Sequence, residues 1–330
     1  MKKQDVVEAI LKGRPSSPGE AGRGTAPANI ALGKYWGKRN EELNLPVTSS
    51  LSISLGELGA DTEIVPAETD SFYLNGDPVP ADDPFARRAA AFLDLFRPDP
   101  STGFRFSTVS RIPVAAGLAS SASGFASTVL ALNDLFGWGL EPRACSILAR
   151  LGSGSASRSV YHGFAQWHAG GAEDGMDSFA EPLNRDWPDF RIGILELSDK
   201  PKPIGSRPAM QRTVETAELY AAWPAQANAD LETLRAAIET RDFPRLGETA
   251  EGNAMAMHAT MIATRPAILY WQPESVAAMQ EVWAAREDGL PLYFTMDAGP
   301  NLKLLFLQPD RSAVRDIFPE IKIINPFDQS

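Results

Sequence analysis

The sequence predicts a mixed α+β protein, large enough for one big domain or for two lobes that share a core. Its 330 residues are 44% hydrophobic, and a chain of this length can bury a sizeable apolar core. Strands are predicted where apolar and polar residues alternate, as at residues 47–55. Helices are predicted where apolar residues recur every three or four positions, as at residues 243–263.

In the first half of the chain, the clearest element is the strand at residues 47–55. Leu51, Ile53 and Leu55 alternate there with serines, which predicts a half-buried antiparallel strand. An Asn-Gly dipeptide at residues 75–76 is typical of a hairpin turn. The other elements predicted in this half are strands at 61–65, 71–74, 104–110 and 160–168, and helices at 84–96, 125–133 and 142–151.

The second half begins with an apolar strand at residues 191–197, and helical segments follow it. Prolines at 224 and 266 and the Arg-Asp junction at 241–242 separate these segments. The elements predicted here are helices at 213–222, 230–240, 243–263 and 275–286, and strands at 291–295 and 302–307.

Residues 1–24 are predicted to be a flexible extension of the folded part. Residues 5–11 have the pattern of a short amphipathic helix. Residues 14–24 are rich in Gly, Pro and Ser, a composition typical of a linker.

The composition argues against several classes of protein. Acidic residues outnumber basic ones by 42 to 31, which disfavours general nucleic-acid binding. Cys145 is the single cysteine, so an internal disulfide and a cysteine-based metal cluster are excluded. The three histidines show no metal-ligand spacing. No apolar run approaches the length of a membrane span and no secretory signal is visible, so we expect a cytoplasmic protein.

A run of small, uncharged residues stands at 113–124, which read Pro-Val-Ala-Ala-Gly-Leu-Ala-Ser-Ser-Ala-Ser-Gly before an apolar helix. Its glycines let a ligand approach the backbone, and hydroxyls with the N–H groups of a helix start can surround an anion. It is not a P-loop, because no lysine follows the second glycine. A buried helix with a serine-rich cap is the alternative interpretation.

Three further segments carry candidate site residues. Residues 34–38 read Lys-Tyr-Trp-Gly-Lys, with cations on both sides of an aromatic pair. Residues 152–159 read Gly-Ser-Gly-Ser-Ala-Ser-Arg-Ser, and a lone arginine among hydroxyls suits a carboxylate ligand. Residues 293–301 read Tyr-Phe-Thr-Met-Asp-Ala-Gly-Pro-Asn, with an aspartate at a strand end. On composition alone, each of the three could be an ordinary solvated turn.

Together, the four segments resemble the motifs of the diphosphomevalonate decarboxylases, a branch of the GHMP kinase superfamily, in the family's order. The resemblance covers roughly residues 25–307. It implies a two-lobed α+β fold with a cleft between the lobes. The implied N-terminal, ATP-binding lobe (25–189) is of the ribosomal protein S5 domain 2-like type, and the implied C-terminal lobe (190–330) is a ferredoxin-like α/β sandwich.

The resemblance also implies an activity, the conversion of (R)-5-diphosphomevalonate and ATP into isopentenyl diphosphate, CO2, ADP and phosphate through phosphorylation of the 3-hydroxyl. ATP and Mg2+ are the implied cofactors, and a homodimer is expected. Asp297 would orient the hydroxyl or take its proton, Arg158 would hold the substrate carboxylate, and Lys34 would assist phosphoryl transfer. The other implied ligands are Tyr35, Lys38, Ser153, Ser155, Ser206 and Arg207 for the substrate, and Gly117, Leu118, Ala119, Ser120, Ser121, Ala122 and Ser123 for the nucleotide.

One loop, at residues 202–210, departs from the family pattern. Gly205 replaces the first serine of a Ser-Ser pair, and Pro208 and Ala209 replace its later part. The loop lies where a diphosphate would differ from a monophosphate, so a phosphomevalonate decarboxylase is an alternative. A mevalonate 3-kinase-like enzyme and a catalytically silent metabolite sensor are two others, and the presence of Asp297 argues against both.

Overall fold

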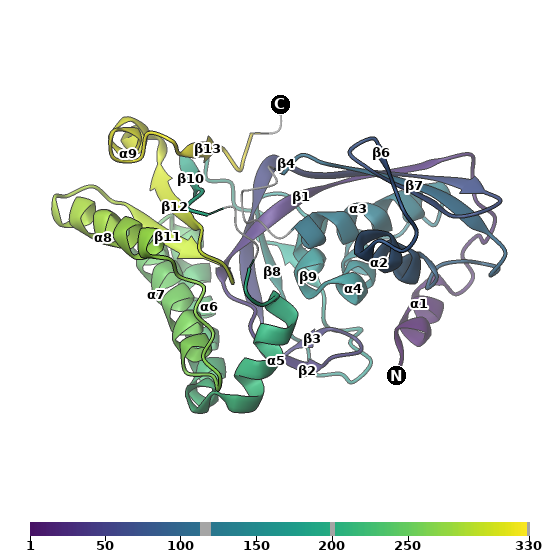
Figure 1. Ribbon diagram of the computed structural model, residues 1–330, viewed down its shortest axis with the longest axis horizontal. Helices are drawn as coiled ribbons and strands as arrows, with labels where there is room; N and C mark the ends of the chain where they lie inside the picture. Colours follow the sequence, from purple (N-terminus) through teal and green to yellow (C-terminus); the bar gives the residue numbers. More distant parts are fainter. Residues whose placement is uncertain (113–119, 199–201, 329–330) are drawn as a thin grey trace.

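The chain folds into two lobes, each a β-sheet covered by helices (Figure 1). The structure is a computed structural model, and it describes residues 1–112, 120–198 and 202–328. Its α+β, two-lobed architecture confirms the fold class predicted from the sequence.

The sheet of the first lobe is antiparallel except for one strand pair. In the described residues its order is β6 (Asp77–Val79), β5 (Ser71–Leu74), β7 (Gly103–Ser110), β4 (Ser50–Ala67), β8 (Phe164–Trp167) and β9 (Ala180–Pro182), and β1 (Gly22–Gly33) pairs with β4. The exception is the parallel pair of β5 and β7. A separate hairpin consists of β2 (Lys38–Asn40) and β3 (Leu45–Pro46).

The second lobe has a four-stranded sheet in its described part, ordered β11 (Tyr293–Met296), β12 (Leu302–Leu307), β10 (Phe190–Leu195) and β13 (Lys322–Ile324). The helices of the two lobes are α1 (Lys3–Leu11), α2 (Pro84–Leu93), α3 (Ser120–Leu135), α4 (Pro142–Gly152), α5 (Ser206–Thr216), α6 (Trp223–Thr240), α7 (Phe243–Ile262), α8 (Pro273–Glu287) and α9 (Arg311–Ile317). Short 3-10 helices are η1 (Gly154–Val160), η2 (Glu218–Ala222) and η3 (Gln308–Asp310).

The two lobes share a hydrophobic core. Ile30 of β1 and Ile53 of β4 are fully buried and belong to one cluster with Leu234 of α6 and Leu246 of α7. Because the two lobes bury these side chains against each other, strands of the first lobe are fixed relative to helices of the second. The residues that directly follow these strands and helices in the chain are therefore held in fixed positions relative to one another.

The central strand β4 differs from its prediction. It runs unbroken from Ser50 to Ala67, where the sequence predicts two strands. The predicted half-buried character is wrong as well, because Ser50, Ser52 and Ser54 are as buried as the apolar residues between them. The reason is that η1 and its neighbours cover the serine face: the Ser50 hydroxyl accepts a hydrogen bond from the Arg158 side chain.

Other elements also differ from the prediction, among them α6, which begins at Trp223 and not at residue 230. The strand predicted at 160–168 is a 3-10 helix up to Val160, followed by the short β8. The helix predicted at 213–222 ends at Thr216, and η2 follows. The 12-residue strand β1 was not predicted, because its composition of small residues lacks a clear alternation.

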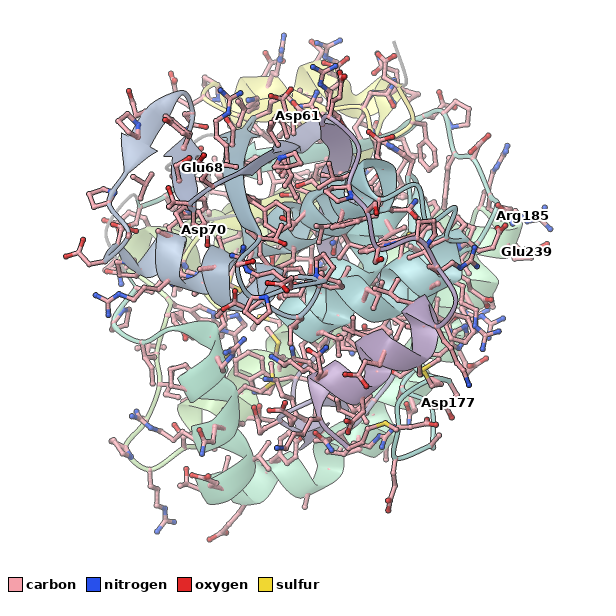
Figure 2. The ribbon with its side chains drawn as sticks, turned by 90° about the vertical axis from the view of Figure 1, so that its right-hand side faces the viewer. Asp61, Glu68, Asp70, Asp177, Arg185 and Glu239 are labelled. Carbon is pink, nitrogen blue, oxygen red and sulfur yellow. The ribbon has the colours of Figure 1, made fainter. Side chains whose placement is uncertain are left out.

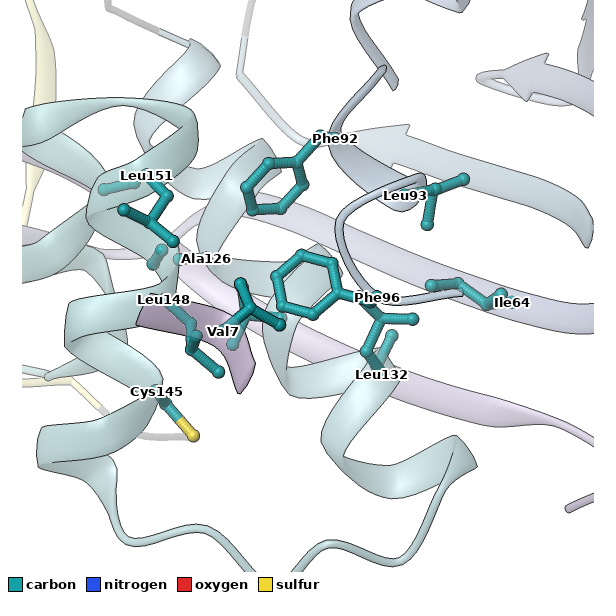
Figure 3. Close-up of a cluster of buried hydrophobic side chains, with 14 of the residues drawn as sticks. Val7, Ile64, Phe92, Leu93, Phe96, Ala126, Leu132, Cys145, Leu148 and Leu151 are labelled. Carbon is teal, nitrogen blue, oxygen red and sulfur yellow. The ribbon is translucent and has the colours of Figure 1, made fainter. Parts of the chain in front are cut away.

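The N-terminal segment packs along the first lobe. Val6 and Val7 are buried in the main core cluster, and Figure 3 shows Val7 among Phe96, Leu132 and Leu148. Residues 14–24, whose composition predicts flexibility, lie against α3 and its end: the Gly19 N–H donates to the Leu135 carbonyl at 2.6 Å. At Gly22 and Gly24, a Cβ atom would come within 2.2 and 2.3 Å of the α3 backbone, so only glycine permits this approach.

The excess negative charge is carried at the surface. Figure 2 labels Asp61, Glu68, Asp70 and Asp177 around the outer face of the first lobe, together with the ion pair between Arg185 and Glu239. Within the described residues, no helix has both the length and the apolarity that a membrane span requires.

Candidate active site

Asp297 and Lys34 form an ion pair between the two lobes. Asp297 directly follows β11 of the second lobe, and Lys34 directly follows β1 of the first. The Lys34 Nζ donates to Asp297 Oδ1 at 3.0 Å and to the carbonyl oxygen of Ala31 at 2.8 Å. The lysine side chain is 2% exposed and the aspartate side chain 29% exposed, so the carboxylate is the open end of the pair.

A second buried lysine stands on the other side of the same carboxylate. The Lys303 Nζ lies 4.0 Å from Asp297 Oδ2, and its side chain is also 2% exposed. Lys303 belongs to β12, which pairs with β11 so that Met296 lies opposite Leu302. Sequence reasoning missed this residue, although a lone lysine inside the apolar strand β12 was the signal that could have found it.

The charges of the neighbouring lysines decide the protonation state of Asp297. Burial works to raise the pKa of this carboxyl, but the positive charges of Lys34, Lys303 and Lys202 outweigh it and hold the pKa well below its usual range. Burial lowers the pKa of Lys303 to about 8, against the opposing pull of Asp297. Asp297 is therefore a carboxylate throughout the physiological pH range.

The backbone around the ion pair is held by a second set of polar side chains. The Lys34 N–H donates to Asn253 Oδ1 at 2.7 Å, and Asn253 in turn donates to Asp230 at 2.8 Å. His258 Nε2 lies 3.1 Å from the carbonyl oxygen of Asp297. Because burial lowers the pKa of His258 to about 4, this ring is neutral and donates the hydrogen bond. These contacts fix both ends of the ion pair.

Arg158 is a buried cation that pairs with no carboxylate within salt-bridge distance in the described chain. Its Nη1 donates to Ser50 Oγ at 2.5 Å and its Nη2 to Asn29 Oδ1 at 3.4 Å, while its Nε has no partner. Burial lowers the pKa of Arg158 to about 10, and the negative charge of Asp297 opposes that shift. A desolvated guanidinium with neutral partners and a free donor is a receptor for an anion.

An aromatic wall stands next to Arg158. The rings of Tyr35 and Trp167 meet edge to face at 4.8 Å, and the Arg158 guanidinium lies 5.9 Å from the centre of the Trp167 ring. The Tyr35 hydroxyl is buried without a hydrogen-bond partner. At Gly154, a Cβ would come within 2.7 Å of Trp167 and 2.9 Å of Tyr35, so this position requires glycine.

Three of the predicted substrate ligands, Lys38, Ser206 and Arg207, lie on β2 and at the start of α5. The Lys38 Nζ donates to Glu41 at 2.9 Å, in a pair where the lysine side chain is 5% and the glutamate side chain 61% exposed. Ser206 and Arg207 form the exposed start of α5. Burial and then the nearby charge of Arg207 lower the pKa of Lys38, so these two cations act on each other.

Two family models match the chain and together cover most of it. Residues 26–180 match the diphosphomevalonate decarboxylase-like N-terminal domain, and residues 192–326 match the mevalonate 5-diphosphate decarboxylase C-terminal domain. The chain belongs to the diphosphomevalonate decarboxylase family. The family predicted from the four motifs is thus confirmed.

Individual relatives agree with this membership. The chain is 38% identical over 316 residues to the diphosphomevalonate decarboxylase of Aspergillus fumigatus, covering 88% of this chain and 78% of that one. A crystal structure of the mevalonate diphosphate decarboxylase from Staphylococcus aureus superposes with a TM-score of 0.87 at 34% identity, over 93% of this chain and 95% of that one. A solved structure of MDDEF in complex with MVAPP, AMPPCP and magnesium gives a TM-score of 0.86 at 39% identity, over 92% of this chain and 95% of that one.

The serine loop, which the diphosphomevalonate decarboxylase motif assigns to the nucleotide, is described in part. Gly117, Leu118 and Ala119 lie outside the described residues, and α3 begins at Ser120. Ser121 is exposed on the first turn, whereas Ala122 and Ser123 are buried. Of the described side chains, that of Ser121 is therefore the one that solvent reaches.

Sequence reasoning missed three residues that the structure adds to this candidate site. Besides Lys303, they are Asn29 and Ser50, which hold the Arg158 guanidinium from β1 and β4. Asn29 also donates to the Ser159 hydroxyl at 2.7 Å. Both are small polar residues within strands, and the sequence does not show that the two strands meet η1.

No group of three or more His, Cys, Asp or Glu residues suited to a metal ion occurs in the described parts of the chain. A magnesium ion that phosphates and water help to hold needs only one or two protein carboxylates. The donor set is therefore compatible with a magnesium–nucleotide complex.

Proposed function

We propose that the protein converts (R)-5-diphosphomevalonate and ATP into isopentenyl diphosphate, CO2, ADP and phosphate, a step of isoprenoid biosynthesis in the mevalonate pathway. The observation that carries this proposal is the constellation of Asp297, its two lysines and the unpaired Arg158. An ionised carboxylate and a guanidinium without an acidic partner suit this substrate. Positive charge develops at one of its carbon atoms, and the neighbouring carbon atom loses a carboxylate.

Asp297 acts mainly through its charge and its hydrogen-bonding oxygens. Because Lys34 and Lys303 hold its pKa far below neutral, it is a weak base. It can orient the 3-hydroxyl for attack and stabilise positive charge at C3 when the new phosphate leaves. Of the two roles predicted from the sequence, orientation with charge stabilisation is thus better supported than proton abstraction.

Arg158 holds the substrate carboxylate until it leaves as CO2. Its Nε has no protein partner, and its remaining contacts are to the neutral side chains of Ser50 and Asn29. A guanidinium fixed in this way can bind a carboxylate with two parallel hydrogen bonds and align the C–C bond that breaks.

The remaining sequence-predicted ligands form the rest of the proposed site. Tyr35, whose buried hydroxyl is unpartnered, contacts the substrate together with Ser153 and Ser155, whose hydroxyls lie 3.2 Å apart. Lys38 and Arg207 neutralise its phosphates, and Lys34 supports phosphoryl transfer next to Asp297. The remaining residues assigned are Ser206 for the substrate, and Gly117, Leu118, Ala119, Ser120, Ser121, Ala122 and Ser123 for ATP.

Magnesium neutralises the phosphates of ATP during transfer when it is bound. The protein contributes the start of α3, where N–H groups and the Ser121 hydroxyl suit a phosphate group.

The finer assignments from the resemblance belong to the same proposal. They are the ribosomal protein S5 domain 2-like type of the first lobe, the ferredoxin-like type of the second, the cleft between them, a cytoplasmic location and a homodimer. The shared core of the lobes supports an active site built from both. Size-exclusion chromatography with light scattering tests the dimer.

One assay tests the proposed reaction. The purified protein is given ATP, Mg2+ and either mevalonate, its 5-phosphate or its 5-diphosphate, and ADP and CO2 are both counted. We expect equal amounts of the two products with the diphosphate. Turnover of the monophosphate alone would indicate the phosphomevalonate decarboxylase alternative, and ADP without CO2 would indicate a 3-kinase.

A further inference from the structure

The N-terminal helix α1 begins beside the turn next to the predicted phosphate ligand Lys38, although neither family model includes this helix. Its first residue is Lys3, whose N–H donates to Glu42 Oε1 at 3.3 Å. Glu42 belongs to the same turn as Glu41, the partner of Lys38. Figure 1 shows the β2–β3 hairpin, which carries this turn, between α1 and α5.

Buried side chains hold α1 in this position. Val6 and Val7 are at most 2% exposed and belong to the core cluster that contains Leu43 and Leu45 of the hairpin region. Burying a valine side chain stabilises the position of the helix that carries it. The position of Lys3 is thus set by hydrophobic packing one turn away, and its side chain does not have to be ordered by the ligand alone.

The charges of two other cations act on Lys3 here. Burial lowers the pKa of Lys3, Glu42 raises it, and the charges of Arg207 and Lys38 lower it further. Burial raises the pKa of Tyr35, and the positive charges of Arg158 and Arg207 oppose that shift. The contact of the Lys3 N–H with Glu42 and the ion pair of Lys38 with Glu41 place Lys3 and Lys38 at the same acidic turn.

We propose that Lys3 is a ligand for the terminal phosphate of the substrate, so that the N-terminal helix completes the phosphate end of the active site. The inference rests on the proposed function, because it assumes that Lys38 and Arg207 bind the substrate phosphates. A phosphate among the three cations relieves their mutual repulsion, and Lys38 can exchange its exposed partner Glu41 for the ligand. Lys3 then favours a diphosphate over a monophosphate, whose single phosphate does not reach as far.

The test compares Lys3→Ala with Lys12→Ala, a matched control at the exposed C-terminal end of the same helix. The value of kcat/KM is measured for the 5-diphosphate and for the 5-monophosphate, and KM is measured for ATP. We expect Lys3→Ala to lower kcat/KM for the diphosphate about tenfold through KM, since one hydrogen bond between charged groups is lost. The loss with the monophosphate should be smaller, the KM for ATP unchanged and Lys12→Ala neutral. Lys3→Arg should restore most of the affinity.

Two results would overturn the inference while leaving the proposed function intact. One is a Lys3→Ala enzyme whose KM for the diphosphate equals that of Lys12→Ala. The other is an equal loss with both substrates that Lys3→Arg does not restore, which would indicate a structural role for the residue. A wild-type enzyme that releases no CO2 from the diphosphate would overturn both the proposed function and this inference.

Discussion

The two ends of the proposed active site, one around Asp297 and one at the proposed phosphate ligands, are built differently. Around Asp297, the buried Lys34 and Lys303 lie 3.0 and 4.0 Å from the carboxylate, and His258 contacts the Asp297 carbonyl oxygen. Asn253 holds the backbone N–H of Lys34. At the phosphate end, Arg207 stands on an exposed helix start, and the turn that carries Glu41 offers a largely exposed partner to Lys38.

This difference matches the demands of the two ends. A charge that must stabilise a transition state is most effective when it is fixed in advance and shielded from water. A site for a highly charged phosphate group gains from long cationic side chains that can adjust while water is displaced. We therefore expect substitutions at the Asp297 end to affect turnover and those at the phosphate end to affect affinity.

The largest expected effect is that of Asp297→Asn. This variant keeps the shape of the side chain but removes the charge, so turnover should fall by about 10²–10⁴-fold or more. ATP binding and the circular dichroism spectrum should be preserved, because the side chain is partly exposed and the core is untouched. Steady-state kinetics beside Asp288→Asn, in the exposed turn after α8, measure the effect. Turnover close to wild type would show that the preorganised end does not act on the reaction.

Arg158→Lys should separate the two chemical steps. The lysine keeps one charge but loses the planar, two-pronged grip on the carboxylate, and misalignment of the breaking bond costs up to about 10²-fold in rate. A quenched single-turnover reaction should then yield ADP in excess of CO2, with a 3-phosphorylated intermediate accumulating. If ADP and CO2 fell in strict proportion, Arg158 would have no separate role in decarboxylation, and a fully active variant would reject the carboxylate assignment.

Lys38→Ala and Arg207→Ala probe the phosphate end. Each removes a contact between charged groups worth about 1.5–3 kcal/mol, so the KM for the diphosphate should rise by roughly 10–100-fold, with less change in kcat or in the KM for ATP. Lys322→Ala, an exposed lysine on β13, provides a charge-matched control. A rise in the KM for ATP alone would assign this end to the nucleotide.

The smallest effect concerns pH and Lys303. The pKa of this lysine is lowered to about 8, so it is charged below that pH and neutral above it. We expect kcat to fall as pH rises through about 8, by at most about tenfold per pH unit, because Asp297 then loses one of its cations. In the Lys303→Arg variant, this fall in kcat (the alkaline limb of the pH profile) should begin at a higher pH, since a guanidinium stays charged. An unmoved limb would point to Lys34 or Lys202, whose pKa values are also lowered.

Prediction from sequence succeeded where the signal is local. The helices at 142–151 and 243–263 were predicted to within one residue at each end, because apolar periodicity and flanking prolines mark them. The strand β1 was missed because its small residues show no clear alternation, and β4 was predicted as half-buried because the element that covers its serine face lies far away in the chain. No local pattern reports which element will cover the second face of a strand.

The sequence by itself determined the family, the α+β class and the identity of Asp297, Arg158 and Lys34 as the residues to examine. It did so through short, unusual motifs whose residue types suit one chemistry. The tertiary structure alone decided that Lys303 flanks the Asp297 carboxylate and that Lys3 contacts the turn that carries Glu41 and Glu42. These placements depend on contacts between segments far apart in the chain, and such contacts arise only when the cores of the two lobes and the N-terminal helix pack together.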